Sequence, residues 1–385
     1  MENSFIINEL GEERNLYFNA VAPPIMQTSN FAFSKVDDLR KAFEDEQSES
    51  LYTRGINPTV QILSHKLAAL DGAEACLLLN SGASAIFAAV FSVVQSGDHI
   101  ISVNKPYNWA QQMFNNVLPR FGVSTTFVDG RSVDNFRAAI TSSTRLIYLE
   151  SPNTLTYDLQ DLEAVAALAR QHGIVTICDN SYCTPLYQQP IKWGIDLSLQ
   201  SATKFIGGHS DVVAGVLSGT NERISKIFHS EFLNMGLQLS PFNAWLLLRG
   251  LRTLPVRLEK ISYTTKQMVA WLKQHPKVES VLFPLDEENP QYALAKKQMS
   301  GACGLVTIIM KAESMGEIVR FCESLQHILM AVSWGGHESL ALPKCASLLP
   351  EQFDPQNPEH RMIRFYFGLE EPEYLMNDIA HAFEK

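Results

Sequence analysis

Two residues of this sequence, a lysine and an aspartate, each follow an apolar, strand-like run and are placed to do chemistry. Lys204 lies between such a run and a glycine pair, in Ser201-Ala-Thr-Lys-Phe-Ile-Gly-Gly-His-Ser-Asp211. A lysine in this position is expected to be half buried. Because burial disfavours the ammonium form, its amine is suited to forming a Schiff base with an aldehyde.

The aspartate ends an apolar run upstream of the lysine, Gly173-Ile-Val-Thr-Ile-Cys-Asp179. Ligands of α/β proteins bind where strands end, so Asp179 and Lys204 could meet in one crevice. A carboxylate facing a pyridinium nitrogen and a lysine holding an aldehyde carbon are the two fixed points of a pyridoxal phosphate site. The pair therefore predicts this cofactor.

A phosphate group needs backbone N–H donors at the start of a helix, together with hydroxyl groups. The segment Asn80-Ser81-Gly82-Ala83-Ser84-Ala85 follows a predicted strand and opens a helical run. Taken alone, this segment is better explained as an ordinary capped turn. Ser201 and Thr203 are expected to share one face of a strand, because side chains alternate with a period of two, and to add hydroxyl donors.

The elements that must position these residues follow an α/β pattern from about residue 75 to 220. Short β-rich runs alternate there with helical periodicity, which is typical of a mainly parallel sheet. A crossover helix is predicted over about 161–172. The predicted strands are Ala75–Leu79, His99–Asn104, Ser124–Val128, Arg145–Glu150, Ile174–Cys178, Leu197–Ser201 and Val212–Leu217.

The pattern changes after Ser240. A long helix is predicted over 241–275, which Pro255 should kink or break. Shorter elements follow: strands at 304–310, 329–333 and 362–367, and helices at 315–325 and from 371 onward. We therefore expect an irregular N-terminal arm (1–50), a cofactor-binding large domain (51–240) and a small α+β domain (241–385).

Composition agrees with a two-domain soluble enzyme. The chain has 385 residues, of which 46% are hydrophobic and 19% charged, and its net charge of -10 argues against nucleic acid as the main partner. We expect neither a secretory signal nor a membrane span, because the longest apolar stretch, Ala85–Val94, falls well short of the roughly 20 residues a span needs. The expected location is the cytoplasm.

Six cysteines are scattered through mostly apolar contexts with no Cys-x-x-Cys pair. Reduced, buried thiols are therefore expected, and neither disulfides nor a metal site. The cysteines are Cys76, Cys178, Cys183, Cys303, Cys322 and Cys345.

Several motifs in one order along nearly the whole chain resemble the cystathionine lyase and synthase family, the pyridoxal-phosphate-dependent enzymes of cysteine and methionine metabolism. The resemblance is closest to cystathionine β-lyase. It implies the fold type I (aspartate aminotransferase-like) architecture. Besides the lysine segment, the matching motifs are Tyr52-Thr-Arg54-Gly-Ile-Asn-Pro-Thr, Glu150-Ser-Pro152, Cys178-Asp-Asn-Ser-Tyr-Cys-Thr-Pro185, Arg249-Gly-Leu-Arg-Thr-Leu254, Ser333-Trp-Gly-Gly-His-Glu-Ser339 and Ile363-Arg364-Phe-Tyr-Phe-Gly-Leu-Glu370.

The resemblance implies roles for the cofactor residues. Lys204 matches the Schiff-base lysine that moves protons, and Asp179 matches the partner of the pyridine nitrogen. Tyr107 matches the tyrosine that stacks on the ring and takes part in proton transfer. The implied phosphate donors are the backbone of Gly82 and Ala83 and the hydroxyls of Ser201 and Thr203.

The resemblance also implies how substrate and subunits are bound. Arg364 matches the arginine that holds the substrate α-carboxylate, for which a planar two-pronged donor suits better than lysine. Ser333 assists it, and Trp334 lies beside it. Tyr52 and Arg54 match the pair that reaches the phosphate of a neighbouring subunit, so a homotetramer with shared active sites is expected. The implied substrate is a sulfur amino acid.

Taken singly, these residues have plainer explanations. Tyr107 could be a packing tyrosine, Arg364 an ion-paired arginine and Asp179 a turn residue. His209 is more often structural than catalytic, and Glu338 could be a helix cap or an ion-pair partner. The functional interpretation becomes stronger only because these residues occur together, in the order of the family motifs.

Departures from the family pattern favour β-elimination over γ-elimination. The asparagine expected at the cofactor ring hydroxyl is replaced by Thr154, although a one-residue shift would bring Asn153 there instead. Val332 stands where γ-acting members usually have a glutamate that pairs with the distal ammonium of the substrate, although methionine γ-lyase-like members also have valine there. Trp334 replaces their leucine, and Trp109 replaces the cysteine of methionine γ-lyases. The alternatives are γ-synthase or γ-lyase activity, or a cofactor-binding protein without turnover.

Overall fold

The computed structural model describes residues 1–302 and 304–385. The chain forms two compact units. Unit one contains Met1–Thr154, Asp158–Gly207 and Asp211–Arg252. Unit two contains Leu155–Tyr157, Gly208–Ser210 and Thr253–Lys385. The three-part division into arm, large domain and small domain stays a prediction.

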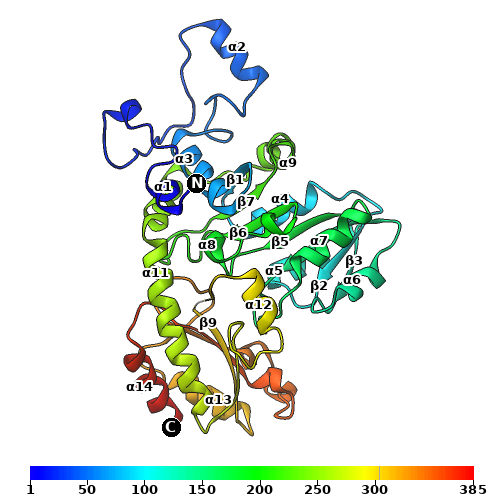
Figure 1. Ribbon diagram of the computed structural model, residues 1–385, viewed down its shortest axis with the longest axis vertical. Coiled ribbons are helices and arrows are strands. Elements are labelled where there is room, and N and C mark those ends of the chain that lie inside the picture. Colours follow the sequence, from blue (N-terminus) through cyan, green and yellow to red (C-terminus); the bar gives the residue numbers. More distant parts are fainter. Residues whose placement is uncertain (303) are drawn as a thin grey trace. The chain divides into compact units, whose positions relative to one another are not determined.

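Unit one is built on a seven-stranded sheet of order β1-β7-β6-β5-β4-β2-β3 (Figure 1). All neighbouring strands are parallel except β7, which is antiparallel to β1 and β6. The mainly parallel α/β prediction is thus confirmed. The strands are β1 (Ala75–Leu79), β2 (His99–Val103), β3 (Ser124–Val128), β4 (Thr144–Glu150), β5 (Val175–Asp179), β6 (Leu197–Ser201) and β7 (Gly215–Gly219).

Both faces of this sheet are covered, because neighbouring residues of a strand point to opposite sides. Ile100 and Leu146 pack with α4 residues in one buried cluster. Their chain neighbours Ile101 and Ile147 pack with α7 residues in another. The helices of unit one are α1 (Asn3–Asn8), α2 (Val36–Glu44), α3 (Pro58–Asp71), α4 (Gly82–Phe91), α5 (Asn108–Gln112), α6 (Val133–Ala139), α7 (Leu162–Gln171), α8 (Thr184–Tyr187), α9 (Asn221–Ile227) and α10 (Leu233–Met235).

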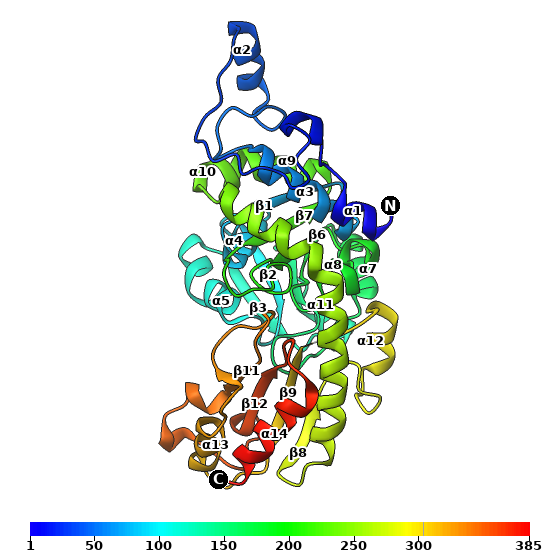
Figure 2. The same cartoon turned by 90° about the vertical axis from the view of Figure 1, so that its left-hand side faces the viewer.

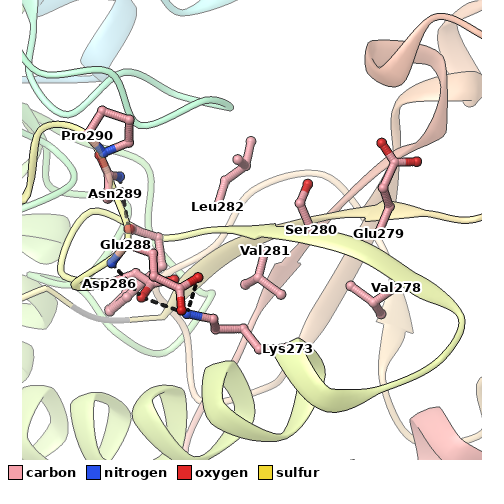
Figure 3. Close-up of a pocket in the computed structure, with 11 residues that line it drawn as sticks. Lys273, Val278, Glu279, Ser280, Val281, Leu282, Asp286, Glu288, Asn289 and Pro290 are labelled. Carbon is pink, nitrogen blue, oxygen red and sulfur yellow. Dashed lines mark hydrogen bonds and ion pairs between the residues drawn. The ribbon is translucent and has the colours of Figure 1, made fainter.

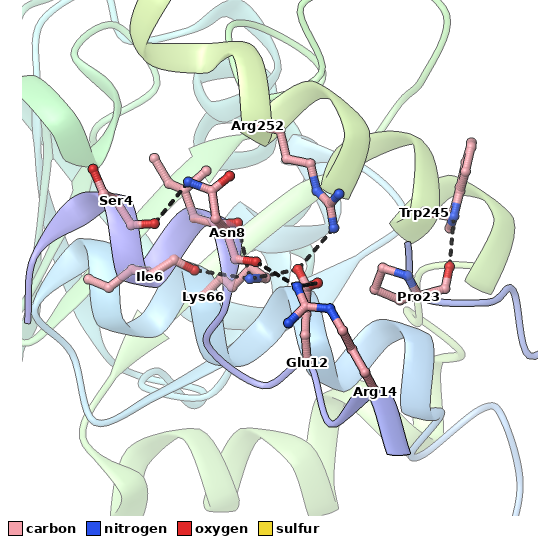
Figure 4. Close-up of polar contacts among 10 residues, drawn as sticks. Ser4, Ile6, Asn8, Glu12, Arg14, Pro23, Lys66, Trp245 and Arg252 are labelled. Atoms are coloured by element: carbon pink, nitrogen blue, oxygen red, sulfur yellow. Dashed lines mark hydrogen bonds and ion pairs between the residues drawn. The ribbon is translucent and has the colours of Figure 1, made fainter. Parts of the chain in front are cut away.

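A buried ion cluster fixes the first residues of the chain (Figure 4). The ammonium of Lys66, on α3, is 3.0 Å from Oε1 of Glu12 and donates to the carbonyls of Ile6 and Ile7. Arg252 and Arg14 also contact the Glu12 carboxylate, at 3.0 and 3.1 Å. The predicted arm is therefore anchored at its start. Figure 1 and Figure 2 show the loop that carries α2 projecting from the sheet.

The long helix α11 runs from Pro241 to Gln274 without a break. The prediction that Pro255 would break it is wrong. A proline removes one hydrogen bond, and a buried apolar stripe that includes Leu251, Leu254 and Leu258 offsets that loss. Gly250 is needed for packing, since a Cβ there would lie 2.4 Å from the carbonyl oxygen of Gly207.

Unit two is built on a five-stranded sheet of order β10-β11-β12-β9-β8. The predicted strand at 329–333 is reduced to two residues, and β8 and β11 were not predicted. Its strands are β8 (Val278–Leu282), β9 (Leu305–Met310), β10 (Leu329–Met330), β11 (Leu340–Pro343) and β12 (Met362–Tyr366), and its helices are α12 (Tyr292–Gln298), α13 (Met315–Glu323) and α14 (Pro372–Phe383).

Two further expectations concern membranes and thiols. Within the described ranges, none of the helices has the length and apolar character that crossing a bilayer requires. Five cysteines are free and buried: Cys76, Cys178, Cys183, Cys322 and Cys345. Cys303 lies outside the described residues.

Candidate active site

The carboxyl ends of three adjacent strands form the centre of the candidate site in unit one. Asp179 ends β5, is 8% exposed, and lies in register with Glu150 at the end of β4. Ser181 connects Asp179 to the end of β6: its amide donates to Oδ1 of Asp179 at 2.9 Å, and its hydroxyl accepts from the amide of Ser201 at 2.7 Å. The aspartate is therefore held rigidly.

Lys204 lies in the turn that follows β6 and is partly buried, as predicted. Its amide donates to the carbonyl of Ser201 at 3.1 Å. Burial raises the pKa of the Asp179 carboxyl, while hydrogen bonds from Ser181 and the nearby charge of Lys204 oppose that rise. The structure thus brings Lys204 within electrostatic range of Asp179.

Tyr107 enters the same site from the start of α5. Its amide donates to Oε2 of Glu150. Burial raises the pKa of its phenol, and the nearby carboxylates of Asp179 and Glu150 raise it further. The tyrosine therefore faces the two carboxyl groups, and it is 37% exposed.

The N-terminus of α4 lies against the end of β6. The hydroxyl of Ser81 caps this helix by accepting from the amide of Ser84 at 3.0 Å. A Cβ on Gly82 would lie 3.0 Å from Cβ and Oγ of Ser201, so only glycine fits there without displacing the serine. The first-turn amides of Gly82 and Ala83 therefore lie beside the Ser201 hydroxyl, a set of donors suited to a phosphate.

Thr203 lies differently from what strand periodicity predicted. Strand β6 ends at Ser201, so the two-residue alternation does not extend to Thr203. Its hydroxyl donates to the carbonyl of Ala214 at 3.2 Å and accepts from the Ala214 amide at 3.0 Å. The shared-face argument is wrong for this residue, and its phosphate role stays a prediction.

Tyr52 and Arg54 lie together in unit one. The Arg54 guanidinium carbon is 5.8 Å from the centroid of the Tyr52 ring. Tyr52 is 45% exposed, and Arg54 is exposed as well. The pair thus presents a cation and a phenol on the surface of the chain.

The predicted substrate residues belong to unit two. Arg364, in the middle of β12, is buried, and its Nη2 donates to the carbonyl of Ser333 at 3.4 Å. Ser333 has a φ of 85°, which is unusual for a residue other than glycine and indicates local strain. The neighbouring Trp334 is partly buried. The structure thus joins the predicted arginine to the predicted serine.

Sequence reasoning did not assign a role to several groups of this site. Ser181 ties Asp179 in place, and Glu150 was noted only as part of a motif. Thr154, considered as the partner of the cofactor ring hydroxyl, instead donates its own hydroxyl to Glu150. The sequence did contain one signal for Glu150: like Asp179, it is a carboxylate at the end of an apolar run.

A cavity of 330 Å³ lies in unit two (Figure 3). Strand β8 and the following loop line it, together with Lys273 of α11. The ammonium of Lys273 contacts Asp286 and Glu288, each at 2.9 Å. None of the residues predicted to bind cofactor or substrate lines this cavity.

The residues of unit one fit pyridoxal phosphate. A lysine lies near a buried carboxylate, and a helix N-terminus with a close-approach glycine offers donors for a phosphate. Nδ2 of Asn153 is buried and has no hydrogen-bond partner in the described part of the chain. Such a donor requires an acceptor, which the ring oxygen of the cofactor would supply.

Comparison with known proteins agrees with this chemistry. The profile of the family described as "Cys/Met metabolism PLP-dependent enzyme" matches residues 4–384. The chain is 36% identical to L-methionine gamma-lyase of Treponema denticola, over 97% of this chain and 95% of that protein. It is 34% identical to cystathionine gamma-lyase of Homo sapiens, over 94% and 88%.

The fold comparison gives the same result. The crystal structure of metB from Corynebacterium glutamicum superposes with a TM-score of 0.91 at 30% identity, covering 100% of this chain and 98% of that one. The predicted fold class, cofactor and enzyme class are confirmed. The chain belongs to the family of pyridoxal-phosphate-dependent enzymes of cysteine and methionine metabolism.

Proposed function

We propose that the protein is a carbon–sulfur lyase that carries out β-elimination on L-cystathionine. The products are homocysteine, pyruvate and ammonia. The observation that carries the lyase assignment is the placement of Lys204 within electrostatic range of the buried carboxylate of Asp179. The choice of β-elimination rests on Val332, Trp109 and Trp334. The expected substrate class is a β-thioether of an amino acid.

Pyridoxal phosphate, when bound, supplies the electron sink that makes the α-proton of an amino acid removable. The side chains of this protein bind the cofactor and transfer the protons. Asp179 keeps the ring nitrogen protonated, and the amine of Lys204 removes the α-proton and returns a proton later. The first turn of α4 and Ser201 bind the phosphate.

Three further residues are proposed to orient the substrate and the cofactor. Arg364 binds the α-carboxylate with two parallel N–H donors, and the strained Ser333 holds that arginine through its carbonyl. Tyr107 covers the cofactor ring and stays a neutral phenol, because burial and two carboxylates raise its pKa.

Three side chains favour β-elimination over γ-elimination. Val332 is 74% exposed and apolar, so it offers no charge to a distal substrate ammonium. Trp109, which is 62% exposed, stands where methionine γ-lyases have a cysteine. Trp334, next to Ser333, stands where γ-acting members usually have leucine. The three positions thus lack the side chains that the resemblance associates with γ-acting enzymes.

The second candidate is γ-elimination, which the names of the relatives favour. L-methionine gamma-lyase of Treponema denticola and human cystathionine gamma-lyase share about a third of their residues with this chain. This reaction would produce 2-oxobutanoate. The two candidates share Lys204 and Asp179, so these residues do not discriminate between them.

Identification of the keto acid tests the choice. Purified holoenzyme is incubated with L-cystathionine, and separately with L-methionine, and the products are resolved by chromatography. Pyruvate with homocysteine from cystathionine is the expected result. If 2-oxobutanoate predominates, the β-lyase proposal is wrong. A cofactor band that does not respond to any amino acid would instead indicate a binding protein without turnover.

We also propose a homotetramer in which Tyr52 and Arg54 complete the phosphate site of a neighbouring subunit. Their exposure and mutual contact support this role. A cytoplasmic location is proposed as well. The free, buried state of the five described cysteines fits a reducing compartment.

A further inference from the structure

Glu150 is a second buried carboxyl group directly beside Asp179. It ends β4, is 5% exposed, and is the register partner of Asp179 on the neighbouring parallel strand. Register partners of adjacent strands point to the same face of a sheet, and the strands are about 4.8 Å apart. The two carboxyl groups therefore face the same small region.

Both oxygens of Glu150 accept a hydrogen bond. The Tyr107 amide donates to Oε2, and the Thr154 hydroxyl donates to Oε1. A protonated carboxyl can still accept at both oxygens and has one O–H left to donate. These contacts connect Glu150 to the residue at the start of α5. On their own they would lower the pKa of Glu150, so its neutral form depends on burial and on the register partner Asp179.

The surroundings of Glu150 disfavour a second negative charge. Asp179 faces it from β5, and Tyr107, Tyr148 and Cys178 are the other titratable groups that interact with this carboxyl pair. The cation near the pair is Lys204, which interacts with Asp179. Burial, and secondly the charge of Asp179, raise the pKa of Glu150 to about 8.

We propose that Glu150 is a positioning residue of the proposed reaction: as a neutral acid it fixes the backbone of Tyr107 and leaves Asp179 as the single anionic carboxylate for the cofactor nitrogen. Two buried anions on neighbouring strands would repel each other. A proton on Glu150 removes that repulsion and leaves the negative charge on Asp179. The inference rests on the proposed function only in assigning the cofactor ring to Tyr107 and Asp179.

Two substitutions separate the two parts of the role. Glu150→Gln keeps the oxygen that accepts from the Tyr107 amide and resembles the neutral acid, but it cannot ionise. Glu150→Ala removes the acceptor altogether. Glu222→Gln is the matched control, since Glu222 is exposed on α9 of the same unit.

The readouts are the dissociation constant of pyridoxal phosphate, obtained by titrating it into the apo form of each variant, and the circular dichroism of the bound cofactor between pH 6 and pH 9. Glu150→Ala should bind the cofactor at least tenfold more weakly and lose most of the dichroic band. Glu150→Gln should stay within threefold of wild type in affinity. It should also lack the spectral change that we expect wild type to show as Glu150, whose pKa is raised to about 8, loses its proton.

Two results would overturn the inference. In the first, Glu150→Ala matches the control in affinity and dichroism. In the second, Glu150→Gln is as impaired as Glu150→Ala, which would mean that the anion rather than the neutral acid is required. Because neither readout measures turnover, failure of the lyase proposal in the keto-acid assay leaves this test intact.

Discussion

At the scale of single residues, each unit buries ionisable groups that need a specific partner. Arg364 is buried in β12 beside the carbonyl of Ser333, and Asp179 is buried within range of Lys204. A buried charge without a partner destabilises a protein, so each of these groups is expected to have a ligand or a neighbour that neutralises it. Because these groups are expected to serve a ligand, substituting them should reduce ligand binding or reaction rate more than it reduces the free energy of unfolding.

Lys204→Ala should abolish both the visible absorption band of the bound cofactor and the elimination activity. Only the lysine amine can make the covalent link to the cofactor aldehyde. Absorption spectra and keto-acid assays of the purified variant measure the two effects. Retention of both colour and activity would show that the central assignment is incorrect.

Arg364→Lys should raise the KM for cystathionine roughly 10- to 100-fold, because a bidentate charge-assisted contact is worth about 1.5–3 kcal/mol and lysine offers only a point charge. The absorption of the bound cofactor should stay unchanged. Steady-state kinetics on both proteins give the comparison. An unchanged KM would remove Arg364 from the substrate site.

Glu150 also predicts how stability depends on pH. Burial and the charge of Asp179 raise the pKa of Glu150 in the folded protein to about 8, above its ordinary value of 4.5. Its contribution to stability is therefore fully present below pH 4.5 and is lost as pH rises through 8. Glu150→Gln should escape this loss. The melting temperature of the variant relative to wild type should rise from pH 5 to pH 9 by about 2 °C or more, the shift expected per kcal/mol in a large domain.

At the scale of elements, the buried Glu12 cluster holds the start of the chain against α3 and α11. The side chains of Glu12 and Lys66 are fully buried, and Lys66 also binds two carbonyls of α1. Burial lowers the pKa of Lys66, and the hydrogen bond with Glu12 opposes that effect. The ammonium thus depends on its carboxylate partner.

Glu12→Ala should lower the free energy of unfolding by about 3–5 kcal/mol, the usual effect of removing one partner of a buried ion pair. The first 20 residues should also become sensitive to limited proteolysis. Glu2→Ala, at an exposed position before α1, is the control. Equal proteolysis patterns for the two variants would contradict the anchoring role.

At the scale of the whole molecule, we propose that each active site is completed by a neighbouring subunit. We expect Arg54 to serve the site of a neighbouring subunit. Co-expression of an Arg54→Ala chain with a Lys204→Ala chain should then restore activity, because some mixed dimers would contain one native site. Each variant expressed alone should be inactive or nearly so. If mixed oligomers form but activity does not recover, then either Arg54 and Lys204 of one chain serve the same site or Arg54 lies outside the site.

The sequence by itself determined the local features: the apolar runs that become β1 to β6, the helix that starts at Gly82, and the positions of Lys204 and Asp179 at strand ends. Periodicity and turn residues are properties of adjacent positions, so they can be recognised without the fold. The ordered motifs then indicated the cofactor and the family, which the comparisons confirmed.

Only the tertiary structure decided how distant segments meet. Strand register placed Glu150 beside Asp179, and the packing of α11 kept the helix intact through Pro255. The end of β6 at Ser201 turned the Thr203 hydroxyl to Ala214, against the predicted alternation. These outcomes depend on partners far away in the sequence, whose burial and hydrogen bonds outweigh local preference; a local pattern contains no information about those partners.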